Sequence, residues 1–188
     1  MEFSELVQIV KDAICICEIK IKNDYRKILS EADFERVLSN EIASLLETQK
    51  NSERFVVHNQ ISHYPQEEPN RQNERDSQVD ILIAKNDNID IDAIHHKGVL
   101  ICGDSIVMEL KYIQISESVN RIKEDLNKCG SLLNCEKNNF AFFIVVLLEN
   151  NNKYEDAEKC IKEYCEANNI SNTNLFIRVI TKKPLNNE

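Results

Sequence analysis

Four ionisable side chains occupy positions where the surrounding pattern is apolar. Asp80 is the single charge in the apolar run 79–84, and Glu41 interrupts the apolar stripe of a predicted helix. Glu109 and Lys111 lie in another apolar run, 105–112, where strand alternation places both side chains on one face. A buried carboxylate is unfavourable unless it is paired or binds a metal, so these four positions are candidates for a shared site.

Three acids and a lysine at one point have a coherent chemistry. Two or three carboxylates chelate a hard divalent cation such as Mg²⁺ or Mn²⁺. Such a cation polarises a phosphoryl oxygen and acidifies a bound water. A neighbouring lysine ammonium positions that water or stabilises the charge that develops at phosphorus. The pattern therefore predicts metal-dependent hydrolysis of phosphodiester bonds.

The elements that must position these residues are predicted from periodicity. Helices are expected over 4–22, after a capping box formed by Ser30 and Asp33, after a cap at Ser116, and over 154–168. Strands are expected at 55–61, 79–84, 105–112, 140–148 and 175–181. Whether 99–102 forms an additional short strand is left open. A loop at 64–78 and a polar excursion at 85–98 separate them. No repeat or second domain is apparent, so we expect a single α/β domain over 1–188, with a mixed central sheet flanked by helices.

In this order and on these elements, the four residues resemble the PD-(D/E)XK nuclease superfamily, the restriction-endonuclease-like proteins. The resemblance implies an αβββαβ core over about 31–148, with an extra N-terminal helix and a C-terminal αβ unit. It also implies that Asp80, Glu109, the backbone carbonyl of Leu110 and Glu41 bind the metal, and that Lys111 assists the attacking water. The predicted helix over 122–133 gives Asp125 and Lys128 a weaker claim to function.

Several alternatives stay open at this point. The stretch between Asp80 and Glu109 is long and contains Asp90, Asp92 and Asp104, any of which could replace Asp80 as a metal ligand. Glu109 and Lys111 could instead form a simple ion pair on an exposed sheet face. The same fold could also serve as a non-catalytic interaction or regulatory module. Histidines such as His58 and His63 on or near a predicted strand are interpreted as structural or surface residues.

The formal net charge of -9 bears on the substrate. DNA is the favoured substrate, with RNA the less favoured one, but a polyanion is repelled by an acidic chain. The cations that could contact phosphates are Arg71, Arg75, Arg121, Lys123 and Lys128. Because acidic residues lie among them, we expect a homodimer or a basic partner protein to complete the binding surface.

The remaining features favour the cytoplasm. The seven cysteines follow no disulfide or zinc pattern and are interpreted as reduced. The longest apolar run, 140–148, is too short to cross a membrane as a helix, and the acidic N-terminus does not resemble a secretory signal. A restriction, repair or defence role in a bacterium or phage would suit such a protein.

Overall fold

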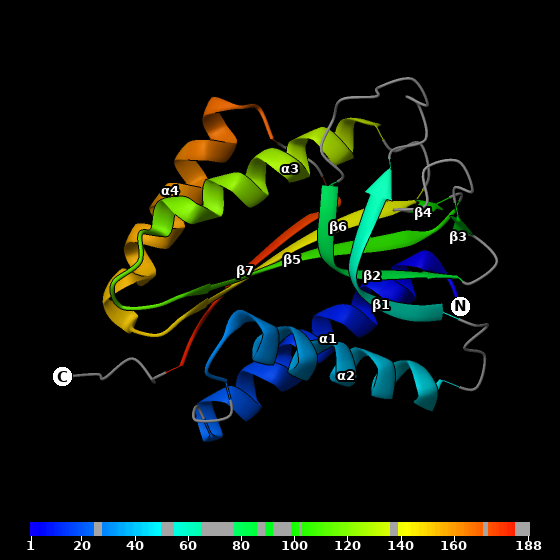
Figure 1. Ribbon diagram of the computed structural model, residues 1–188, viewed down its shortest axis with the longest axis horizontal. Helices are drawn as coiled ribbons and strands as arrows, with labels where there is room; N and C mark the ends of the chain where they lie inside the picture. Colours follow the sequence, from blue (N-terminus) through cyan, green and yellow to red (C-terminus); the bar gives the residue numbers. More distant parts are fainter. Residues whose placement is uncertain are drawn as a thin grey trace.

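The chain forms three layers, with helices on both faces of a central mixed sheet (Figure 1). The computed structural model describes residues 1–24, 28–49, 55–64, 77–85, 89–91, 99–101, 103–135, 139–170 and 173–182. It is an α/β protein with two N-terminal helices and further helices between the later strands. The predicted fold class is therefore confirmed at this level.

The N-terminal helices cover one face of the sheet. Helix α1 (Phe3–Asn23) and helix α2 (Glu31–Thr48) pack together against it (Figure 1). Helix α2 begins where expected, because the side chain of Ser30 accepts a hydrogen bond of 3.1 Å from the backbone N–H of Asp33.

The opposite face is covered by helices α3 (Ile122–Cys135) and α4 (Tyr154–Ala167). A short 3-10 turn precedes each of them: η3 (Val119–Arg121) before α3 and η4 (Asn151–Lys153) before α4. The cap expected at Ser116 is wrong. Ser118 caps this segment instead, since its hydroxyl accepts from the backbone N–H of Asn120 at 3.2 Å. Two serines two residues apart offer similar caps, and the chain uses the later one.

The sheet has the strand order β3-β4-β1-β2-β5-β6-β7. Five long strands form most of the sheet. Strand β2 pairs with β1 and with β5 in antiparallel orientation, and β6 pairs with β5 and with β7 in parallel orientation. They are β1 (Phe55–Tyr64), β2 (Ser77–Lys85), β5 (Ser105–Ile113), β6 (Phe140–Leu148) and β7 (Leu175–Thr181). Two three-residue strands, β3 (Ile89–Ile91) and β4 (Val99–Ile101), extend the edge beyond β1. Strand β3 was not predicted, because it lies within a polar stretch and forms by pairing with β4.

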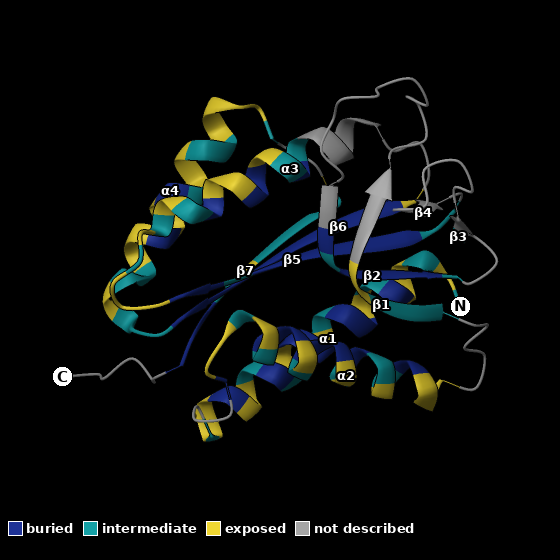
Figure 2. Ribbon diagram, viewed as in Figure 1, coloured by how far each residue is buried: buried dark blue, intermediate teal, exposed yellow. Residues whose placement is uncertain are grey.

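Side-chain alternation divides the core into two clusters, one on each face of the sheet. In β5, Met108 and Leu110 pack toward α1 and α2, whereas Val107 and Ile113 pack toward α3 and α4. Strand β6 is buried along its whole length (Figure 2). None of the described helices is both long and apolar enough to cross a membrane.

Candidate metal centre

Three of the predicted site residues, Asp80, Glu109 and Lys111, lie where β2 and β5 separate. These strands pair from Ala84 opposite Ser105 to Ile81 opposite Met108. The next residues of these two strands are Asp80 and Glu109. Glu109 points to the side covered by α3, where Lys128 contacts it, whereas Asp80 lies in the gap between the strands, in contact with the backbone of Leu110 and the side chain of Gln60. Beyond this point β5 continues beside β6 to Ile113, while its other edge loses the β2 ladder.

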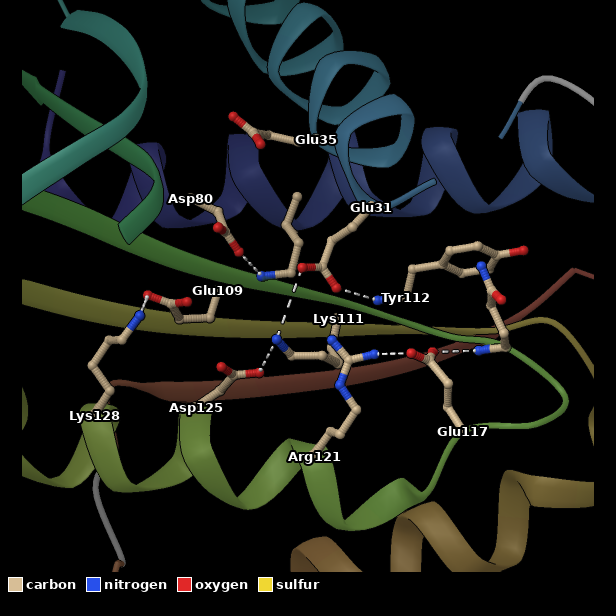
Figure 3. A network of polar contacts seen from close by, with 12 residues as sticks. Glu31, Glu35, Asp80, Glu109, Lys111, Tyr112, Glu117, Arg121, Asp125 and Lys128 are labelled. Atoms are coloured by element: carbon tan, nitrogen blue, oxygen red, sulfur yellow. Dashed lines mark hydrogen bonds and ion pairs between the residues drawn. The ribbon is translucent and has the colours of Figure 1, made fainter. Parts of the chain in front are cut away.

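Two carboxylates take over the hydrogen bonds that β2 no longer makes to this edge of β5. The backbone N–H of Leu110 donates to Asp80 Oδ2 at 2.7 Å, and that of Tyr112 donates to Glu31 Oε2 at 2.9 Å (Figure 3). The N–H and C=O of a strand residue point toward the same neighbour. The backbone carbonyl of Leu110 therefore also belongs to this open edge, beside Asp80.

Glu109 is a buried acid with a lysine partner. Its side chain is 3% exposed, and its Oε1 lies 2.8 Å from the ammonium of Lys128 on α3 (Figure 3). Burial, with the negative charge of Asp80, raises the pKa of Glu109 to about 8 even though Lys128 opposes this rise. Without a metal ion, Glu109 therefore takes up a proton at a higher pH than a free carboxyl group does.

Lys111 is mostly covered, lies between acids and remains charged. Its ammonium lies 3.5 Å from Asp125 Oδ2 on α3 and 3.9 Å from Glu31 Oε1 on α2 (Figure 3). Burial alone would lower the pKa of Lys111, but these carboxylates outweigh it and raise the pKa above its usual value. Burial also raises the pKa of Asp125 to about 6, although Lys111 and Lys128 oppose the rise.

The acid supplied by α2 is not the predicted one. Glu41 forms an ion pair with Lys20 of α1 and so faces the neighbouring helix. Glu35 takes its place: its Oε2 accepts a 2.6 Å hydrogen bond from Gln60 Nε2, which lies 3.3 Å from Asp80 Oδ1. Six residues of helix rotate a side chain by roughly 600°, so Glu35 and Glu41 cannot share a face. Burial and the charges of Asp80 and Glu31 raise the pKa of Glu35.

Glu31 and Glu35 are not among the site residues predicted from the sequence. Their separation of four residues places them on one face of a helix, in the first two turns after its cap. That spacing was the available signal. The signal is weak, because charged residues are common in the first turn of a helix.

The other candidates lie elsewhere or are already paired. Asp104 accepts a 3.0 Å hydrogen bond from Asn139 at the beginning of β5, five residues before Glu109. Asp90 belongs to β3, at the far edge of the sheet from β5. Among the predicted phosphate contacts, Arg121 forms an ion pair with Glu117, and Lys123 is exposed. The remaining predicted positions, Asp92, Arg71 and Arg75, fall outside the described residues.

The donor set suits a hard divalent cation in charge and chemistry. The network contains the carboxyl groups of Glu31, Glu35, Asp80, Glu109 and Asp125 but only two lysines, Lys111 and Lys128 (Figure 3). Carboxylate oxygens and a backbone carbonyl are ligands that Mg²⁺ accepts. As arranged, no three acidic, histidine or cysteine side chains in the described part of the chain are grouped to hold a metal. The backbone N–H of Leu110 contacts Asp80 and the ammonium of Lys128 contacts Glu109, so a cation would have to replace part of these contacts.

Comparisons of the chain with models of known protein families, with curated proteins and with solved structures gave no significant match. The functional interpretation therefore depends on the fold and on the chemistry of the residues around Asp80 and Glu109.

Proposed function

We propose that this protein is a metal-dependent nuclease that hydrolyses phosphodiester bonds in DNA. The observation that carries the proposal is that Asp80 and Glu109 are the first residues of β2 and β5 beyond the end of their ladder, at the strand fork, with Lys111 two residues further along β5. The order α2-β1-β2-β5-α3-β6 also agrees with the αβββαβ core of the PD-(D/E)XK nucleases, with β3 and β4 as an insertion. We infer from this agreement that the chain has a restriction-endonuclease-like fold.

Each residue then has a distinct role. Asp80, Glu109 and the carbonyl of Leu110 would hold Mg²⁺ or Mn²⁺, with Glu35 rather than Glu41 as the acid from the first core helix. The cation, when bound, would polarise the phosphoryl oxygen and acidify the attacking water. Lys111 would orient that water and stabilise charge at phosphorus, and Asp125 would hold the Lys111 ammonium in place. Water oxygen bonds to phosphorus and one phosphorus–oxygen ester bond breaks, leaving a phosphomonoester and a hydroxyl end.

The acidic surface shapes how DNA would bind. With a net charge of -9, the chain needs an additional source of positive charge near the site. Arg121, on the segment that leads into α3, is paired with Glu117, which leaves less of its charge for a phosphate. We therefore propose a homodimer or a basic partner protein as the form that engages DNA, in a restriction, repair or defence role.

One observation favours the alternative of a non-catalytic interaction module with the same fold. Glu109 is paired with Lys128, and Lys111 is paired with Asp125. The two central residues therefore already have partners without a metal ion. In such a module the ion pairs would only join α3 to the sheet. Metal-dependent cleavage distinguishes this module from the nuclease.

The test is incubation of the purified protein with supercoiled plasmid and with single-stranded DNA, in Mg²⁺, in Mn²⁺ and in chelator. We expect cleavage with either cation, none in chelator, and a loss of at least about a hundredfold in Lys111→Ala. Lys159→Ala is the matched control, because Lys159 is an exposed lysine on α4 that has no assigned role, and it should retain most of the activity. Cleavage that persists in chelator or in Lys111→Ala would refute the nuclease assignment.

A further inference from the structure

Gln60 has an unusual backbone conformation at the proposed site. Of the described residues other than glycine, only Gln60 and Asn169 have a positive φ, 52° in each case. This left-handed conformation is unfavourable for a residue with a Cβ atom and lies within β1, where an extended backbone is the rule. Asn59 pairs with Ile81 and Ile61 with Val79, so Gln60 is the residue opposite Asp80.

The side chain of Gln60 joins two acids from different elements. Its amide nitrogen lies 2.6 Å from Glu35 Oε2 on α2 and 3.3 Å from Asp80 Oδ1 on β2. The two carboxylates repel each other, and this repulsion contributes to the raised pKa of Glu35. A neutral amide that donates to both of them reduces the repulsion without cancelling their charge. A lysine at the same place would cancel part of the charge that attracts a cation.

We propose that Gln60 is a positioning residue that holds Glu35 against Asp80 and so adds a third acid to the cation site. This inference depends on the proposed function, because it assigns Gln60 a role in binding the cation of the nuclease. Glu35 comes from the helical layer, and Gln60 links it to the strand fork. Residues that orient metal ligands through hydrogen bonds commonly change metal affinity by tenfold or more when they are replaced.

The first test is a double-mutant cycle on the affinity for Mn²⁺, measured by calorimetric titration of the full chain without substrate. Gln60→Leu should weaken Mn²⁺ binding about tenfold in the wild-type background and have no further effect in Glu35→Gln. Glu41→Gln is the matched control on the same helix, and it should bind Mn²⁺ like the wild type. Unchanged affinity in Gln60→Leu, or an equal loss in both backgrounds, would overturn the role of Gln60.

The second test separates the backbone strain from the site. Gln60→Gly removes both the strain and the amide, so the melting temperature should rise by a few degrees while Mn²⁺ affinity falls. Asn169→Gly relieves the same backbone conformation at an exposed position after α4, so it should raise the melting temperature without changing Mn²⁺ affinity. Equal Mn²⁺ affinity in Gln60→Gly and Asn169→Gly would overturn the proposal.

A separate variant distinguishes this inference from the function on which it depends. Asp80→Asn should abolish Mn²⁺ binding whatever the role of Gln60. If Asp80→Asn binds Mn²⁺ as tightly as the wild type, the proposed cation site itself is wrong. If Asp80→Asn loses binding while Gln60→Leu keeps it, only the role of Gln60 is wrong.

Discussion

At the scale of single residues, the site is defined by acids that are buried beside other acids. Glu109 and Asp125 are each at most 5% exposed, and both have a pKa well above that of a free carboxyl group. The two lysines of the network reduce this excess of negative charge without balancing it. A divalent cation would supply the missing charge, and it would compete with protons for the Glu109 carboxylate.

This competition predicts how stability depends on pH without metal. The pKa of Glu109 rises from 4.5 to about 8 on folding and that of Asp125 from 3.8 to about 6, so the folded protein binds more protons than the unfolded chain between these limits. Stability should therefore fall as pH rises toward about 8, by at least about 1 kcal/mol. The raised pKa of Lys111 has no effect in this window, because its contribution is lost only at higher pH.

Thermal unfolding in chelator across this pH range measures the effect. Glu109→Gln has no proton to lose there, so its stability should change much less with pH than that of the wild type. Glu155→Gln, an exposed acid in the first turn of α4, provides the matched control and should keep the wild-type dependence. The same pH dependence in Glu109→Gln and the wild type would show that the burial of Glu109 has been misjudged.

At the scale of elements, strands with a buried or alternating pattern were predictable. The bounds expected for β6 and β7 agree with the structure, because β6 is a continuous apolar run and β7 is a short, mainly apolar segment between polar stretches. Strand β3 was missed because a three-residue strand depends on its partner rather than on its own pattern. Local sequence carries periodicity, whereas pairing between distant segments is a property of the folded chain.

The same distinction explains the candidate site. Alternation within β5 was enough to place Glu109 and Lys111 on one face. The four-residue spacing of Glu31 and Glu35 is visible in the sequence, but the ion pair that turns Glu41 away from the site is not, because its partner Lys20 lies on another helix. The ion pair of Lys128 with Glu109 likewise joins α3 to β5 and has no signature in either segment alone.

At the scale of the whole molecule, the net charge of -9 sets a limit on how one copy binds DNA. The isolated monomer should bind DNA weakly, with an affinity that falls steeply as salt increases, because each phosphate contact releases counterions. Fluorescence anisotropy at several salt concentrations, with the mass of the complex measured in parallel, tests this expectation. Tight binding by a demonstrably monomeric sample at physiological salt would contradict the proposed dimer or partner.

The central claim is that Asp80 and Glu109 bind a divalent cation at the strand fork, and a thermal unfolding titration with Mn²⁺ tests it most directly. A cation that binds only the folded state at about a hundred times its dissociation constant adds roughly 2.7 kcal/mol of stability. For a chain of this size the melting temperature should then rise by roughly 5–10 °C in the wild type and very little in Asp80→Asn. No rise in the wild type, or an equal rise in Asp80→Asn, would contradict the assignment of this site.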